Sequence, residues 1–172
     1  ATVGDINLTV DVTGTGLIDL DANGNITFAN LTTGGRVDVN AVGGNIVGGS
    51  SLKTGTDSIA NESMSFTAGG AITLTGVIDT HDSIRLTGGG LVTANSLTAF
   101  DNVTIIAGTA DIANITTTVT GNASLTAGAI TIGGASLDGS LTANATTGAL
   151  NLTGAVTSRG ADSLTANTDI TF

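Results

Sequence analysis

The stretch that decides the fold is Ala129-Ile-Thr-Ile132, which returns as Ala149-Leu-Asn-Leu152 and again as Asp169-Ile-Thr-Phe172. The copies stand twenty residues apart. The same spacing joins a longer column of apolar residues: Ile72, Val92, Ile112, Ile132, Leu152 and Phe172. One spacing held over so many positions is typical of a solenoid, in which each circuit of the chain stacks on the one before. We therefore expect the chain to wind at about 20 residues per coil.

Within each copy, apolar and small polar residues alternate with a period of two, and Gly, Asn or Asp stands at the ends. This alternation predicts short, half-buried β-strands separated by turns, and no segment has the period of a helix. Two further columns accompany the first. The stronger holds Gly4-Asp-Ile6, Gly24-Asn-Ile26 and Gly44-Asn-Ile46 and then Met64, Ile84, Val103 and Ala123, and the weaker holds Val77, Leu97, Leu137 and Val156.

Three strand-sized faces per coil predict an all-β parallel β-helix with a roughly triangular cross-section. The 172 residues would make eight to nine coils. At the ordinary spacing between strands, these coils form a rod about 40 Å long. An antiparallel sandwich of short strands is the open alternative, although it does not explain columns held over so many repeats.

The composition fits a narrow aliphatic interior. The chain contains 26 glycines, four phenylalanines, and neither proline nor cysteine. Proline would remove an amide from a ladder that is paired on both sides, and bulky aromatic rings would distort a tightly packed interior. A glycine column runs through Gly88, Gly108, Gly128 and Gly148, and we expect such glycines to supply positive φ angles at the corners.

The charge excludes two classes of partner. The net charge is −10, and the cations Arg36, Lys53, Arg85 and Arg159 are scattered along the chain. Phosphate backbones and anionic membrane surfaces are held by clustered Lys and Arg, so we expect binding neither to nucleic acid nor to such a membrane. We also expect no membrane insertion, because no apolar run is long enough to cross a bilayer.

Residues 1–172 are expected to form a single domain. The alternation fails near Gly48, where the column of Ile46 also slips in phase, so we expect residues 48–58 to form a protruding loop. The chain begins at Ala1 without an initiator methionine and ends at Phe172 within a repeat. We therefore expect a processed chain or a segment of a longer exoprotein.

A polar column also keeps the twenty-residue spacing: Glu62, Asp82, Asn102, Asn122, Thr142 and Asp162. Stacked Asn and Thr side chains form hydrogen-bonded ladders, which is the structural interpretation. The alternative is a calcium site, since Glu62 and Asp82 on adjacent coils, with Asp101 nearby, would repel each other without a cation.

A second calcium hypothesis rests on Asp19-Leu-Asp-Ala-Asn-Gly24, which matches the start of a calcium-binding loop. The twelfth position should be a bidentate Glu but is Asn30, so an Asn-Gly turn between strands is the simpler interpretation. We expect no cofactor, with calcium as the open alternative.

Catalysis is not expected. His81 is the only histidine and has neither the partners of a zinc site nor those of a nucleophilic triad, so we predict a surface residue. Thr116-Thr-Thr-Val-Thr120 could serve ice binding, but it has no matching rows nearby. N-glycosylation is an open hypothesis, because nine asparagines begin Asn-x-Ser/Thr sequons: Asn7, Asn25, Asn30, Asn61, Asn102, Asn114, Asn122, Asn144 and Asn151.

The segments Ala68-Gly-Gly-Ala-Ile-Thr-Leu-Thr-Gly76, Ala127-Gly-Ala-Ile-Thr-Ile-Gly-Gly134 and Thr147-Gly-Ala-Leu-Asn-Leu-Thr-Gly154 resemble repeats of filamentous-haemagglutinin-type exoproteins. These are very large bacterial adhesins, often exported by two-partner secretion. The resemblance implies a right-handed β-helix that is secreted or held at the bacterial cell surface. Because that family's secretion domain carries Asn-Pro-Asn motifs and this chain lacks proline, the segment would belong to the repetitive shaft. None of the family's binding residues carries over to this sequence.

The expected function is therefore the structural shaft of an extracellular adhesin or fibre. Such a shaft would mediate adhesion or biofilm formation, or would assemble end to end. Its expected partners are a host or neighbouring cell surface, matrix or glycan, and further copies of itself. The alternative is a carbohydrate-binding or carbohydrate-cleaving β-helix.

Overall fold

The computed structural model describes residues 4–49, 51–54, 62–117 and 121–172. Every strand pairing within these residues is parallel, and they contain no helix. In chain order the strands are β1 (Ile6–Leu8), β2 (Val12–Gly14), β3 (Ile18–Ala22), β4 (Ile26–Phe28), β5 (Leu31–Thr33), β6 (Val37–Ala41), β7 (Ile46–Gly48), β8 (Ser51–Thr54), β9 (Met64–Ala68), β10 (Ile72–Thr80), β11 (Ile84–Ala99), β12 (Val103–Thr117), β13 (Ala123–Ala127), β14 (Ile130–Leu137), β15 (Leu141–Ala145), β16 (Leu150–Leu152), β17 (Val156–Ser158), β18 (Ser163–Ala166) and β19 (Ile170–Thr171).

Each coil contributes one strand segment to each of three faces. Face A comprises residues 6–8, 26–28, 46–48, 72–74, 92–94, 110–112, 130–132, 150–152 and 170–171. Face B comprises residues 12–14, 31–33, 51–54, 77–80, 96–99, 114–117, 135–137 and 156–158. Face C comprises residues 18–22, 37–41, 64–68, 84–88, 103–107, 123–127, 141–145 and 163–166.

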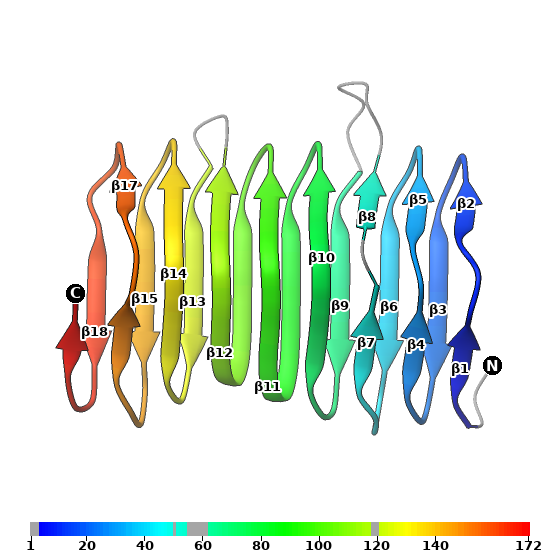
Figure 1. Cartoon of the computed structure of the whole chain (residues 1–172), viewed down its shortest axis with the longest axis horizontal. Coiled ribbons are helices and arrows are strands. Elements are labelled where there is room, and N and C mark those ends of the chain that lie inside the picture. The colour runs from blue at the N-terminus through cyan, green and yellow to red at the C-terminus, as the bar shows by residue number, and fades with distance from the viewer. Residues whose placement is uncertain (1–3, 50, 55–61, 118–120) are drawn as a thin grey trace.

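The coil is right-handed. Faces A and B follow each other in the near, upward leg of each coil in Figure 1, and face C returns in the far, downward leg while the chain advances from right to left. This is the hand that nearly all parallel crossovers take. The predicted all-β, parallel β-solenoid of about 20 residues per coil is therefore confirmed, with eight coils carrying all three faces and β19 beginning a ninth.

The register corrects the column that the sequence suggested. Val92 pairs with Ala110, and Ile112 instead pairs with Ala94 and Ile132. The offset arises because the pairing of β11 with β12 shifts between Gly88 and Leu91. One interior column of face A is Ile6, Ile26, Ile46, Ile72, Val92, Ala110, Ile130, Leu150 and Ile170. A second interior column, two positions further along each strand, contains Ile112, Ile132 and Leu152, as predicted.

The second predicted column joined two different faces. Ile46 pairs with Ile72 on face A, whereas Met64 pairs with Val37 and Ile84 on face C. The third coil is longer than the others: 27 positions, from 37 to 64, separate Val37 from its partner Met64. The extra length moved the apparent column from one face to another.

The predicted loop, residues 48–58, is wrong where it overlaps two strands. Gly48 lies in β7 and residues 51–54 form β8, while residues 50 and 55–58 lie outside the described part of the chain. The weak third column was also wrong in detail. Leu97 pairs with Ile78 and Ile115, and Val77 is exposed beside them. Leu137 pairs with Ser158, and Val156 pairs with Ala135.

One continuous aliphatic cluster fills the interior from the first coil to the eighth. It contains two aromatic rings, Phe28 and Phe66, stacked with their centroids 6.3 Å apart. Gly48 follows Phe28 in the same column, and a Cβ there would lie 2.7 Å from the Phe28 ring and 2.6 Å from Leu74. Gly48 therefore provides the space that Phe28 occupies.

The corner glycines serve close approach rather than positive φ. Among the described glycines, only Gly4 has a positive φ, at 95°. A Cβ at Gly44, Gly128 or Gly154 would instead overlap the carbonyl oxygen of the coil before, from Gly24, Gly108 and Gly133 respectively. The prediction that these corners need positive φ was wrong, because stacking distance is what requires glycine.

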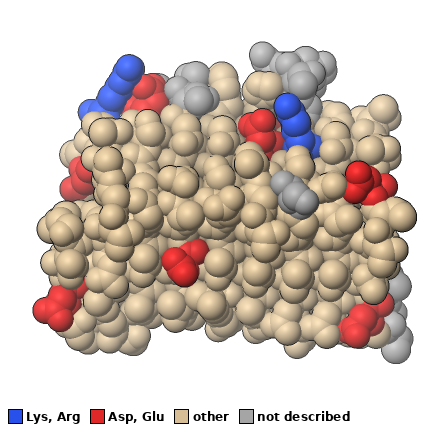
Figure 2. Space-filling model, in the orientation of Figure 1, with Lys and Arg blue, Asp and Glu red and all other residues tan. Residues whose placement is uncertain are grey.

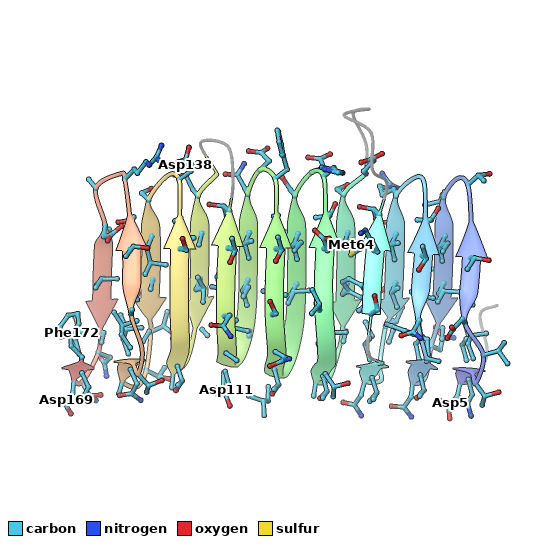
Figure 3. The ribbon with its side chains drawn as sticks, turned by 45° about the horizontal axis from the view of Figure 1, so that its top comes forward. Asp5, Met64, Asp111, Asp138, Asp169 and Phe172 are labelled. Carbon is cyan, nitrogen blue, oxygen red and sulfur yellow. The ribbon has the colours of Figure 1, made fainter. Side chains whose placement is uncertain are left out.

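Surface acids lie along the edges of the rod. Asp5 and Asp169 project at one edge and Asp138 at the opposite edge (Figure 3), whereas Asp111 lies on an outward position of face A in β12. Within the described ranges, no helix has the length and apolarity needed to span a membrane.

Candidate functional site

Asparagine ladders stabilise the corners between faces. At the corner before face A, the backbone N–H of Asn25 donates to Asp5 Oδ1 over 2.6 Å, and that of Asn45 donates to Asn25 Oδ1 over 2.9 Å. The N–H of Ala71 then donates to Asn45 Oδ1 over 2.8 Å. Each side chain thus accepts the amide of the equivalent residue one coil later. A short ladder between faces A and B links Asp11, Asn30 and the N–H of Ser51.

The polar column predicted from the sequence is confirmed in its middle and wrong at other positions. The N–H of Asn122 donates to Asn102 Oδ1, and the N–H of Ser140 donates to Asn122 Oδ1, both over 2.9 Å. Thr142 lies instead on the outer side of face C, paired with Ser124 and Ser163. The ladder position before Asn102 belongs to Ser83, whose Oγ accepts the Asn102 N–H over 3.3 Å.

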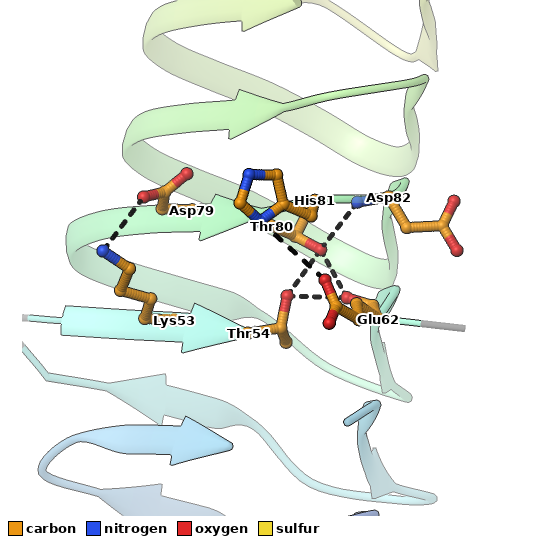
Figure 4. Close-up of polar contacts among 7 residues, drawn as sticks. All are labelled: Lys53, Thr54, Glu62, Asp79, Thr80, His81 and Asp82. Carbon is orange, nitrogen blue, oxygen red and sulfur yellow. Dashed lines mark hydrogen bonds and ion pairs between the residues drawn. The ribbon is translucent and has the colours of Figure 1, made fainter. Parts of the chain in front are cut away.

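Of the five polar residues that are buried in the described part of the chain, four form part of one column at the end of face B. They are Thr33, Thr54, Thr80 and Thr117, and the fifth is Glu62 at the same corner. Thr54 Oγ1 donates to Thr80 Oγ1 and to the Glu62 carbonyl, both over 2.7 Å. Thr80 Oγ1 also donates to that carbonyl and accepts the N–H of Asp82 (Figure 4). Sequence analysis missed this column, because Ala99 and Leu137 interrupt it and the long third coil disturbs its spacing.

The structure does not bring the proposed calcium ligands together. The Glu62 side chain is 2% exposed, and the Asp82 carboxylate points away from it (Figure 4). Asp101 contacts the Ser83 hydroxyl over 3.4 Å. Asp19 and Asp21 lie on strand β3 rather than in a loop, and Asp21 Oδ1 accepts from Asn40. No cluster of three His, Cys, Asp or Glu suited to a metal occurs in the described part of the chain.

His81 is exposed, as predicted, but it also contacts the buried corner. Its side chain is 41% exposed, and its Nδ1 lies 3.8 Å from Glu62 Oε2. The ring of Phe100, from the next coil, packs edge-on at a centroid distance of 6.1 Å. The contact with Glu62 could not be predicted from the sequence, because the buried carboxylate precedes the histidine by almost a whole coil.

The sequon asparagines divide into two groups. Asn25, Asn30, Asn102 and Asn122 belong to the corner ladders. Four others lie on outward strand positions and are exposed or half-buried: Asn7, Asn114, Asn144 and Asn151. Asn61 lies outside the described residues. The structure therefore leaves the outward group accessible to modification.

Charged groups are sparse on the near face of the rod (Figure 2). Three of the four cations form ion pairs: Arg36 with Asp38, Lys53 with Asp79 and Arg159 with Asp138. The scattered arrangement seen in the sequence therefore persists in three dimensions, without a basic patch on the described surface.

The outer surface is hollowed where face A bends into face B. One hollow of about 320 Å³ is lined by Leu74, Thr75, Thr93, Ala94, Asn95, Asp111 and Ala113. A second of about 330 Å³ is lined by Asn114, Ile115, Thr116, Gly133, Gly134, Ala135, Ser136, Ala155 and Thr157. The two hollows are lined by consecutive residues of β12, Ala113 and Asn114, and are together called here the outer trough.

Comparison with protein-family models, with curated proteins and with solved structures finds no match to this chain.

Proposed function

We propose that this chain is a structural shaft of an extracellular adhesin or fibre. The observation that carries the proposal is the single interior cluster, which runs through eight stacked coils. Parallel strand pairing of the same kind joins each coil to the next along the whole cluster. In repeat architectures of this kind, each repeat contacts only the repeats next to it. The number of repeats can therefore change without loss of the fold. Spacing and display are functions that need length and little else.

The resemblance of the coils to filamentous-haemagglutinin-type repeats supports a secreted location and a role in adhesion. The scarcity of cations and the acidic net charge of −10 favour a soluble surface that resists non-specific association. These properties suit a rod that holds adhesive elements away from a cell.

Deletion of one whole coil tests the shaft role. Removing residues 18–36 joins Leu17 to Val37, the partner of Ile18 in the next coil, so every face stays in register. We expect a folded rod that is shorter by about 4.8 Å, measured by small-angle X-ray scattering. Removing only residues 18–27 is the matched control, because it shifts face A and C residues out of register and should unfold the first coils.

Surface location is tested on intact cells that produce the chain. We expect external protease or antibody to reach it, and adhesion of those cells to persist when one coil is deleted in register. A chain found only inside the cells, or adhesion that is abolished by the in-register deletion, would contradict a shaft.

End-to-end assembly is the second form of the same proposal. The outermost coils expose unpaired strands, and Ile170 and Phe172 are 39% and 85% exposed. Unpaired parallel strands are templates for further pairing, whether the next coil comes from flanking sequence or from a second copy. Sedimentation and electron microscopy of the concentrated chain should reveal filaments, and a monomer at every concentration would contradict assembly by a second copy.

A further inference from the structure

The outer trough has a lining that the fold does not require. Asn95, Asp111 and Asn114 are exposed on strands β11 and β12, although Asn and Asp are disfavoured within strands. Their side chains make no hydrogen bond or ion pair with the described residues, in contrast to Asn25, which accepts from Asn45. These three residues therefore contribute nothing visible to the ladders that hold the coils together.

The trough is open because its bend carries small residues. Ala113, Gly133 and Ala155 stand where face A turns into face B. Asn114 lies over Gly134, with its Oδ1 3.2 Å from the position that a Cβ would take. Hydrogen-bonding groups consequently line a concave surface that runs along the rod, with one set per coil at a spacing of about 4.8 Å.

The chemistry of the lining restricts the partner. Besides Asn95, Asp111 and Asn114, it offers the hydroxyls of Thr93, Thr116, Ser136 and Thr157 and contains no cation. A phosphorylated or sulfated polymer would find no cation in the trough and would be repelled by the net charge of −10. An added peptide strand needs a free sheet edge, whereas the strands beneath the trough are paired on both sides, except for β17 at the end of the rod. An apolar partner would find only small exposed apolar groups.

We propose that the outer trough binds a neutral, linear polysaccharide laid along the axis of the rod. Carboxylate and amide groups would accept and donate hydrogen bonds to the ring hydroxyls of successive sugars, with Asn95 on coil five and Asp111 and Asn114 on coil six. The inference goes beyond the shaft function and does not depend on it, because it concerns one side of coils four to eight.

Affinity electrophoresis tests the proposal. The wild-type chain is run in gels that contain laminarin, mannan or linear galactan, and in a gel that contains the acidic polymer alginate. We expect at least one neutral polymer to retard the chain and alginate not to retard it. Retardation by alginate alone, or by no polymer, would overturn the proposal and would leave the shaft function unaffected.

Three substitutions locate the site: Asp111→Asn, Asn95→Ala and Asn114→Ala. Each should weaken the binding of the retarding polymer at least about threefold. The matched controls are Asp19→Asn and Asn144→Ala, exposed strand residues on face C outside the trough, which should bind like the wild type. Circular dichroism establishes that all variants are folded. Binding that survives all three trough substitutions, or that falls equally in the controls, would show that the trough is not the site.

Discussion

The backbone N–H of Asn45 donates a 2.9 Å hydrogen bond to Oδ1 of Asn25, the residue that occupies the same corner one coil earlier. The same side chain oxygen also accepts from the Asn45 side-chain amide over 3.1 Å. At this corner the strand ladder is interrupted, and the asparagine side chain supplies the acceptor that the backbone geometry does not. Side-chain hydrogen bonds therefore hold adjacent coils together at the corner, between the backbone ladders of two faces.

Substitution of Asn25 by Ala should destabilise the chain by about 0.5–1.5 kcal/mol, since it removes the acceptor of the Asn45 N–H. In a chain of this size the midpoint of thermal unfolding would fall by roughly 1–6 °C. The control is Asn7→Ala, an exposed β1 residue outside the ladders, whose melting temperature should match the wild type. Equal melting of the two variants would show that the ladder adds nothing to stability.

Two glycines should respond oppositely to alanine. A Cβ at Gly44 would overlap the carbonyl oxygen of Gly24, whereas a Cβ at Gly16 would meet no atom within 4 Å. Gly44→Ala should therefore destabilise the stack, and Gly16→Ala should stabilise the chain by about 0.4–1 kcal/mol by restricting the unfolded state. Urea titrations measure both. If both substitutions changed the free energy of unfolding by similar amounts and with the same sign, close approach would not be the reason for the corner glycines.

The sequence predicted the class and pitch of this fold because its two signals are local. Alternation within Ala129-Ile-Thr-Ile132 depends only on neighbouring residues, and repetition at position 149 needs only a constant coil length. Where the coil length changes, the prediction failed. Val92 was stacked on Ile112 instead of Ala110 because 18 positions, from 92 to 110, separate it from its partner instead of 20, and this difference leaves no mark in composition.

The candidate site was harder to predict for a related reason. The buried corner joins Thr54, Glu62 and Thr80, which belong to different coils and share no motif. The trough depends on small residues such as Ala113 and Gly133 meeting at one bend. Small residues in the sequence cannot be recognised as the floor of a trough until the coils that carry them are placed side by side. The ladders, in contrast, were foreseen at Asn102 and Asn122, where the spacing is twenty.

Gly48 and Phe28 should be energetically coupled. Gly48→Ala places a methyl group 2.7 Å from the Phe28 ring, and overpacking of this kind costs about 1–3 kcal/mol. Phe28→Leu removes the ring, so the double variant should be more stable than the sum of the two single effects predicts, by more than about 0.5 kcal/mol. Unfolding free energies of the four proteins measure the coupling.

The control for that cycle pairs Gly48→Ala with Leu141→Val, which lies on face C several coils away. Distant sites are additive to within about 0.5 kcal/mol. A coupling as large in the control as in the Phe28 cycle would mean that Gly48→Ala disturbs the whole rod rather than one interior space.

Thr80 should be the most sensitive hydroxyl of the buried column. Its Oγ1 donates to the Glu62 carbonyl, accepts from Thr54 Oγ1 over 2.7 Å and accepts the Asp82 N–H over 3.2 Å. Thr80→Val keeps the shape of the side chain but leaves the Asp82 N–H without this acceptor and the Glu62 carbonyl with Thr54 as its remaining hydroxyl donor. Because buried unsatisfied groups cost about 1–3 kcal/mol, we expect a clear loss of stability in thermal melts.

Thr98→Val is the matched control, since Thr98 lies on the outer side of face B in the next coil. The next coil carries Ala99 at the position of Thr80, so the column tolerates a residue without a hydroxyl where no buried carbonyl needs a donor. A Thr80→Val variant as stable as Thr98→Val would show that the corner at Glu62 does not need the Thr80 hydroxyl.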